Sequence, residues 1–251
     1  MSLLRLHSAV QARNASLARR LLKKGANVNE ANSFGTTPLI IASHNDYTDM
    51  VELLVKKGGA SVSLANNEGG SPLLFAAQEN ALSAAKWLVE RGGASVDQAR
   101  NNGCTPLFMS SQKGHYEVAT MLLAHGAKVD QAMNEGASPL LISSQEGHYE
   151  VATMLLAHGA KVDQTKNDGA SPLIASSENG HHEVVKLLLT KGANMDQVDN
   201  DGDTALSMSR LNGHHEVVKL LLAHGAKVDQ AKKSGDAGEK TEVTEKPFLR
   251  V

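Results

Sequence analysis

Apolar and polar residues follow a pattern that recurs at a fixed interval along the chain. The segment GHYEVATMLLAHGAKVDQ occurs at 114–131 and again, letter for letter, at 147–164. Looser copies fill 180–197 and 213–230. A period of 33–34 residues separates the turn glycines from Gly35 onward. Such a period predicts a stack of similar units rather than one globular domain.

Each unit is predicted to contain two short helices. Thr105-Pro106 is a helix start, because the hydroxyl can accept a free amide hydrogen and proline has no amide to satisfy. This helix is expected to end at Gly114, and a second is expected near 116–124. The apolar face of the second helix is made by Val118, Met121, Leu122 and Leu123. The polar stretch 128–136 then predicts a hairpin-like loop.

These helices are too short to be stable alone, so each unit must pack against a like neighbour. One position near the end of each first helix is small, as close approach of a neighbouring backbone requires: Ser43, Ala77, Ser111, Ser144 and Ser177. In the last unit Arg210 occupies that position, which predicts the end of the stack near residue 231. At the other end, 6–29 matches the second part of the pattern. We expect it to form a polar cap.

The Gly-x-Thr-Pro-Leu step, the Gly-His-x-Glu-Val-Val turn and the Leu-Leu-x-x-Gly-Ala-x-Val-Asp ending resemble ankyrin repeats over about residues 4–231. The resemblance implies an all-α ankyrin-repeat solenoid, with a helix-turn-helix and a β-hairpin loop in each repeat. The implied units are an N-terminal capping half-repeat at 1–31, repeats at 32–65, 66–99, 100–132, 133–165 and 166–198, a C-terminal repeat at 199–231, and a disordered tail at 232–251.

Two departures from the family pattern stand out. The histidine that usually follows Thr-Pro-Leu is replaced by Ile40, Leu74, Phe108, Leu141, Ile174 and Ser207. The usual hairpin aspartate survives only as Asp199. Since both residues tie loops together in the family, we expect hydrogen bonding between repeats to differ or to be weaker here.

The resemblance implies a non-catalytic protein-interaction scaffold that binds a partner through its hairpin tips and concave helix face. The candidate tip residues are Phe34, Asn67, Glu68, Asn101, Asn102, Asn134, Glu135, Asn167, Asp168, Asn200 and Asp201. The candidate helix-end residues are Glu79, Gln112, Lys113, Gln145, Glu146, Glu178 and Asn179. As loop tips and helix ends, these positions are expected to be free of packing duty.

Charge refines the expected partner. The 25 basic and 27 acidic residues nearly balance, which argues against general affinity for nucleic-acid phosphates or anionic membranes. The candidate surface is acidic, with Lys113 counted as its one cation, so a basic or polar partner segment is favoured. An equally good interpretation is that these acidic residues only keep the protein soluble. Phe34 can anchor an interface or fold back over the N-terminal cap.

Candidate catalytic and metal chemistry is sparse. The single cysteine, Cys104, excludes an internal disulfide and a multi-cysteine zinc site, and its place at a helix start predicts partial exposure. Histidines recur once per unit at His115, His148, His181 and His214. Neighbouring units would hold them about 8–10 Å apart, too far to share zinc. We expect no metal, no cofactor, no small-molecule substrate and no enzymatic activity.

Several expectations concern location and alternative partners. The chain has no long apolar run, so we expect no membrane insertion and a cytoplasmic or nuclear monomer. Leu249 and Val251 suit a PDZ groove, which captures a terminal carboxylate. Two alternative functions stay open: a substrate-recognition subunit of a ubiquitin ligase or a host-directed effector, and a nucleic-acid-associated factor that uses the basic N-terminal cap.

Overall fold

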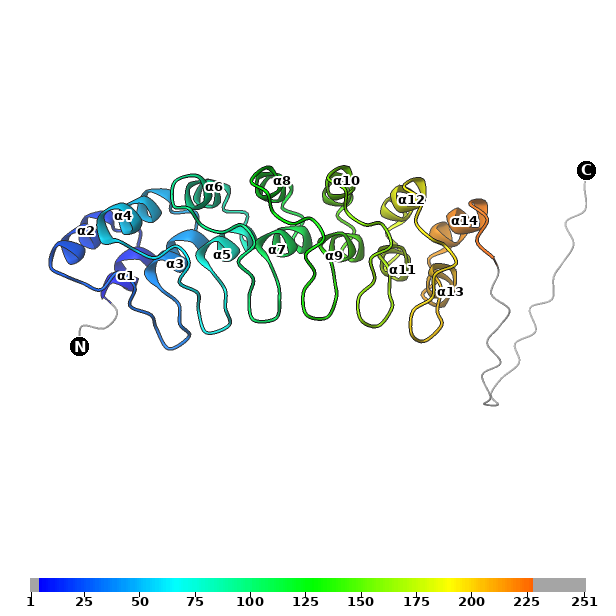
Figure 1. Ribbon diagram of the computed structural model, residues 1–251, viewed down its shortest axis with the longest axis horizontal. Coiled ribbons are helices and arrows are strands. Elements are labelled where there is room, and N and C mark those ends of the chain that lie inside the picture. The colour runs from blue at the N-terminus through cyan, green and yellow to red at the C-terminus, as the bar shows by residue number, and fades with distance from the viewer. Residues whose placement is uncertain (1–4, 228–251) are drawn as a thin grey trace, which may run out of the picture.

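A computed structural model describes residues 5–227, which form an arched row of seven helix pairs (Figure 1). The first helices are α1 (Arg5–Gln11), α3 (Pro38–His44), α5 (Pro72–Gln78), α7 (Pro106–Gln112), α9 (Pro139–Gln145), α11 (Pro172–Glu178) and α13 (Ala205–Leu211). The second helices are α2 (Ala15–Lys23), α4 (Thr48–Gly58), α6 (Leu82–Glu90), α8 (Tyr116–Ala124), α10 (Tyr149–Ala157), α12 (His182–Thr190) and α14 (His215–Ala223). The expected stack end at 231, the tail at 232–251, and Leu249 and Val251 lie outside the described residues.

The two helix rows and the loops form separate layers. In Figure 1 the second helices lie along one side, the first helices in the middle, and the loops along the opposite side. Between residues 5 and 227 the loops contain no β-strand. Each is closed instead by a few backbone hydrogen bonds, such as Arg100 N–H to Cys104 O at 2.8 Å. The repeats are therefore purely helical, with hairpin-shaped turns between them.

The predicted helix starts are confirmed. In five first helices the side-chain oxygen of the N-cap residue accepts the amide hydrogen three residues later, at 3.1–3.3 Å. These N-caps are Thr37, Ser71, Thr105, Ser138 and Ser171. In α13 proline is replaced by Ala205, and Thr204 and Ser207 form a reciprocal capping box instead. The hydroxyl cap is thus kept in a unit that lacks the proline.

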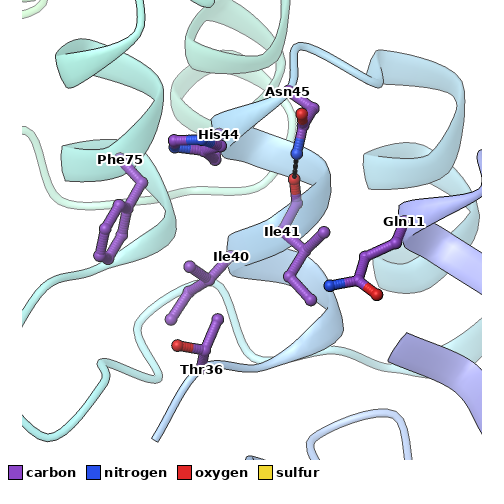
Figure 2. Close-up of a pocket in the computed structure, with 7 residues that line it drawn as sticks. All are labelled: Gln11, Thr36, Ile40, Ile41, His44, Asn45 and Phe75. Atoms are coloured by element: carbon purple, nitrogen blue, oxygen red, sulfur yellow. Dashed lines mark hydrogen bonds between the residues drawn. The ribbon is translucent and has the colours of Figure 1, made fainter. Parts of the chain in front are cut away.

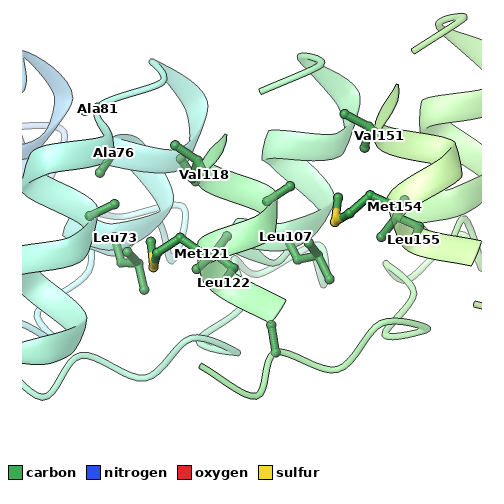
Figure 3. Close-up of a cluster of buried hydrophobic side chains, with 14 of the residues drawn as sticks. Leu73, Ala76, Ala81, Leu107, Val118, Met121, Leu122, Val151, Met154 and Leu155 are labelled. Carbon is green, nitrogen blue, oxygen red and sulfur yellow. The ribbon is translucent and has the colours of Figure 1, made fainter. Parts of the chain in front are cut away.

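The first and second helices share one continuous apolar core. Val118, Met121 and Leu122 are at most 5% exposed, as predicted, whereas Leu123 is only partly buried. Figure 3 shows that Met121 and Met154, one repeat apart, occupy matching places beside the leucines of the first helices. Each unit therefore completes the core of its neighbours, as expected for a quasi-one-dimensional stack.

The replacement of the family histidine has a visible consequence. Five of the six substituted side chains are buried: Ile40, Leu74, Phe108, Leu141 and Ile174. Leu74, Phe108 and Leu141 belong to a second apolar cluster that also contains Cys104 and Ala137 from the loops. Apolar packing thus attaches the loops to the first helices.

The N-terminal unit contains both helices, α1 and α2, although its sequence matches the second part of the repeat best. His7 on α1 is buried, and its Nε2–H donates to Thr36 O at 2.9 Å. This bond ties the first unit to the loop that precedes α3. None of the helices described is long and apolar enough to cross a membrane.

Candidate functional site

The loop tips are joined by a hydrogen-bond ladder that runs along the stack. The backbone N–H of one asparagine in each loop donates to a carbonyl of the preceding loop at 2.8–3.1 Å. Its side-chain amide donates to the backbone carbonyl oxygen of the residue one position earlier in that preceding loop, at 3.0–3.2 Å. The asparagines are Asn67, Asn101, Asn134, Asn167 and Asn200. The expectation that the tips are free of packing duty is wrong for these five side chains, because each holds two loops together.

Hydrogen bonding between units is also maintained away from the tips. Asp97, Asp130 and Asp163 each accept a backbone amide hydrogen of the following unit at 3.0 Å. Within their own loops, Asn32 and Asn66 each accept two amide hydrogens, as Asp199 does. Asparagine therefore replaces the family aspartate in two loops. The departures seen in the sequence do not interrupt hydrogen bonding between units.

The recurring histidines form a further ladder between units. In each case Nε2 lies 2.8–3.0 Å from a backbone carbonyl oxygen in the first helix of the preceding unit. These histidines are His115, His148, His181 and His214. A carbonyl only accepts, so Nε2 carries the hydrogen in each case. Among residues 5–227, no group of three or more histidine, cysteine, aspartate or glutamate side chains could hold a metal ion. The arrangement explains these histidines as ties between repeats.

The acidic surface is less uniform than the sequence indicates. Arg100 lies 3.6 Å from Glu68, and Lys166 lies 2.8 Å from Asp168, so Lys113 is not the only cation among the loops. Partial burial of Asp168 disfavours its ionisation, but the Lys166 ammonium and the Ala170 amide outweigh this effect and lower the pKa of the carboxyl. Two of the candidate acids are therefore already paired.

Other candidate acids remain exposed on the inner face, which we define as the first helices together with the loop tips. Glu135, Glu146 and Glu178 are exposed and form no ion pair within the described chain. Glu79 lies 3.6 Å from His44 Nδ1, an ion pair only when the imidazole is protonated. The free negative charge thus lies mainly in the fifth and sixth of the seven units.

The inner face is hollowed at its N-terminal end. A hollow of about 440 Å³ lies among α1, α3 and α5, which we call the inner hollow. Figure 2 shows Ile40, Ile41 and Phe75 around it. Its polar lining residues are Gln11, Thr36, His44 and Asn45. An apolar floor with a polar rim can accept an apolar side chain of a bound polypeptide.

Phe34 lies in the loop before α3, two residues before Thr36, which lines the inner hollow. Its side chain is 73% exposed, so the interpretation that it folds back over the N-terminal cap is wrong. Among the loop tips it is the one aromatic residue. An exposed aromatic next to an apolar hollow is a favourable anchor for a partner.

Cys104 is buried, contrary to the expected partial exposure. Its exposed fraction is 3%, because it belongs to the second apolar cluster. Burial raises the pKa of the thiol to about 11, although the Arg100 charge opposes the shift. A protonated, enclosed thiol is a poor nucleophile, so the cysteine is a packing residue.

The loop tips and most of the candidate helix-end residues are exposed, whereas Gln112 and Gln145 are half-buried, and the sequence did not predict the inner hollow. Ile41 and Phe75 belong to a repeated helix position, which predicts packing rather than a hollow. Only the spacing of α1, α3 and α5 reveals the space between them. The one signal in the sequence was Phe34, whose place at a tip breaks the polar pattern of the other loops.

The comparisons with known proteins agree with the geometry. No curated protein matches the chain significantly. The family described as ankyrin repeats in three copies matches residues 6–100, 92–166 and 158–232, which together span almost all of the described chain. Ankyrin repeats are generally protein–protein interaction modules. On this match and on the stacked helix pairs, the chain belongs to the ankyrin repeat family.

Proposed function

We propose that this protein is a non-catalytic scaffold or adaptor that holds a segment of another protein along its inner face. The observation that carries the proposal is the inner hollow, which lies in the same strip as the exposed Phe34 and the free acids. In the proposed complex an apolar side chain of the partner enters between Ile41 and Phe75. Basic side chains of the partner approach Glu146 and Glu178.

Three features support this assignment. The inner hollow is lined by first helices, the loop before α3 and Asn45 directly after α3, so a bound segment would not disturb the core. The hydrogen-bond ladders fix the loops in place, which lowers the entropy lost on binding. The exposed acids extend the surface along the row and favour a basic segment through charge complementarity.

Selection of binders from a displayed random-peptide library on the full chain would test the proposal. We expect enriched peptides to combine basic residues with an apolar one. Binding of the strongest peptide should weaken about tenfold in Glu146→Lys/Glu178→Lys, a loss of ~1.4 kcal/mol.

A matched variant controls for net charge. Glu117 and Glu150 are exposed on second helices, away from the inner face, and their double change to lysine alters the total charge equally. The proposal predicts little loss in that variant. Equal loss in both variants, or enrichment of acidic peptides, would contradict it.

A further inference from the structure

A second hollow lies on the opposite side of the N-terminal units. It measures about 390 Å³ and is lined by Arg19, Leu22 and Lys23 of α2 and Lys57 of α4. We call it the outer basic hollow. Its three cations are exposed, and none forms an ion pair or side-chain hydrogen bond within residues 5–227. Three unpaired cations around one hollow form a concentrated positive site.

The acids of α4 do not neutralise this site. Asp49 of α4 lies 3.3 Å from Arg13, and Glu52 lies 2.8 Å from Lys56. Both carboxylates are therefore paired with cations that do not line the outer basic hollow. The positive charge of Arg19, Lys23 and Lys57 remains available to a partner.

Helix stability does not account for these cations. Basic residues near a helix C-terminus interact favourably with the helix dipole. However, α2 and α4 each have two basic residues in the last turn, whereas each of the five later second helices has a single basic residue, at its C-cap: Arg91, His125, His158, Lys191 or His224. Since one such residue suffices in those helices, the larger basic group at the N-terminal end needs another explanation.

We infer that the outer basic hollow binds an acidic segment of a partner protein. Charge complementarity favours a carboxylate-rich segment, and Leu22 in the lining suits an apolar side chain among those carboxylates. This surface is on the second-helix side, so the inference does not depend on the proposed function of the inner face. The protein would then carry two binding surfaces of opposite charge.

The structure favours an acidic protein segment over a nucleic acid or a membrane. The later second helices carry Glu90, Glu117 and Glu150, so the basic surface does not continue along the row as a phosphate backbone requires. No strongly exposed large apolar side chain of the described chain lies on α2 or α4 to enter a bilayer.

Fluorescence anisotropy with the full chain tests the inference. The probe is a fluorescein-labelled peptide of glutamates around a central leucine, in about 0.1 M salt. We expect binding that weakens at least about tenfold in Arg19→Glu/Lys23→Glu and separately in Lys57→Glu. All three residues are exposed, so these variants should fold, and thermal unfolding would verify this.

The control is Lys186→Glu/Lys191→Glu at α12, four units away from α4, which changes net charge as much as the double variant and also involves exposed residues. At this salt concentration charges farther than about 10 Å are largely screened, so less than about threefold weakening is expected. Equal loss in the control, or no binding of the peptide, would overturn the inference. Tighter binding of a DNA duplex or of phosphatidylserine vesicles, lost in the same variants, would overturn it in favour of that class of partner.

Discussion

The first three units and the four that follow use different residues in the turn between their two helices. In the later units the turn between the two helices is Gly114, Gly147, Gly180 or Gly213, with φ of 71–76°. In the earlier units the same position is Arg13, Asp46 or Asn80, with φ of 49–55°. The later units thus use the residue best suited to a left-handed backbone, whereas the earlier ones tolerate strain there.

The residue after this turn differs in the same way. The later units place a histidine there, whose ring packs against the glycine of the preceding unit: a Cβ on Gly114, Gly147 or Gly180 would lie 2.5–2.6 Å from the next histidine. The earlier units have Asn14, Tyr47 and Ala81 instead. At Asp46 another tie appears, since its carboxylate accepts Ala84 N–H at 2.7 Å.

The inner hollow and the outer basic hollow both lie in the first three units, where the repeat is irregular, whereas a further hollow between α8 and α10 is lined by repeated residues, among them Tyr116 and Tyr149. The nearly identical later units supply regular ties instead. Residues repeated in every unit thus hold the stack together, whereas under the proposed function the residues that break the repeat form the binding surfaces.

The largest expected effect comes from adding a methyl group at the regular turns. Gly180→Ala should reduce the free energy of unfolding by about 2–4 kcal/mol, because backbone strain and crowding of His214 add. Gly213→Ala has the same φ but nothing within 4 Å, so only about 1–2 kcal/mol is expected. Chemical denaturation measures both.

In the third unit the same turn position is Asn80, which already has a Cβ and faces the unit that contains His115. Its φ of 55° is lower than that of the turn glycines, which shows how the backbone adjusts to a Cβ. If Gly180→Ala and Gly213→Ala cost the same, the backbone adjusts freely. The Gly–His contact would then contribute nothing to coupling between units.

Loss of a histidine tie should have the next largest effect. His181→Ala removes the hydrogen bond to Gln145 O and should lower the free energy of unfolding by about 1–1.5 kcal/mol. The adjacent His182 is exposed and pairs with the equally exposed Glu183, so His182→Ala should change the free energy of unfolding by less than about 0.5 kcal/mol. A larger loss from His182→Ala in thermal unfolding would contradict the assigned tie.

Replacing a buried serine by alanine should change the free energy of unfolding less, and in the opposite direction. The hydroxyls of Ser111, Ser144 and Ser177 are buried without a hydrogen-bond partner, and the third unit has Ala77 at this position. Ser144→Ala should therefore raise the free energy of unfolding by about 0.5–1 kcal/mol. Ser143→Ala should not, since the Ser143 hydroxyl donates to Leu140 O at 3.0 Å. Destabilisation by Ser144→Ala in urea would mean that its hydroxyl has a partner.

The smallest effect concerns the strained turns of the early units. Asn80→Gly should stabilise the protein by about 0.5 kcal/mol, because glycine accepts a positive φ without strain. Asp46→Gly should not, because it removes the bond to Ala84. Equal melting temperatures for the two variants would argue against the tie at Asp46.

The helix pairs and their order could be predicted because each helix start depends on neighbours in sequence, such as Thr105 and Pro106. The burial of Cys104 could not, since it depends on loops and helices of different units. The same holds for the asparagine ladder, whose partners lie 33–34 residues away. The outer basic hollow arises from the placement of α4 beside α2, whereas the sequence alone indicates only a basic cap.

Hydrogen-exchange mass spectrometry with the strongest peptide from the library selection tests the central claim most directly. If the irregular early units receive the apolar side chain of the peptide, the peptide should slow exchange in the loops before α3 and α5 and in those helices. Phe34→Asp/Ile41→Ala should abolish the slowing, and both new residues occur at the equivalent positions of other units, as Asp201 and Ala175. Slowed exchange confined to α9–α14, unchanged in the variant, would contradict the claim.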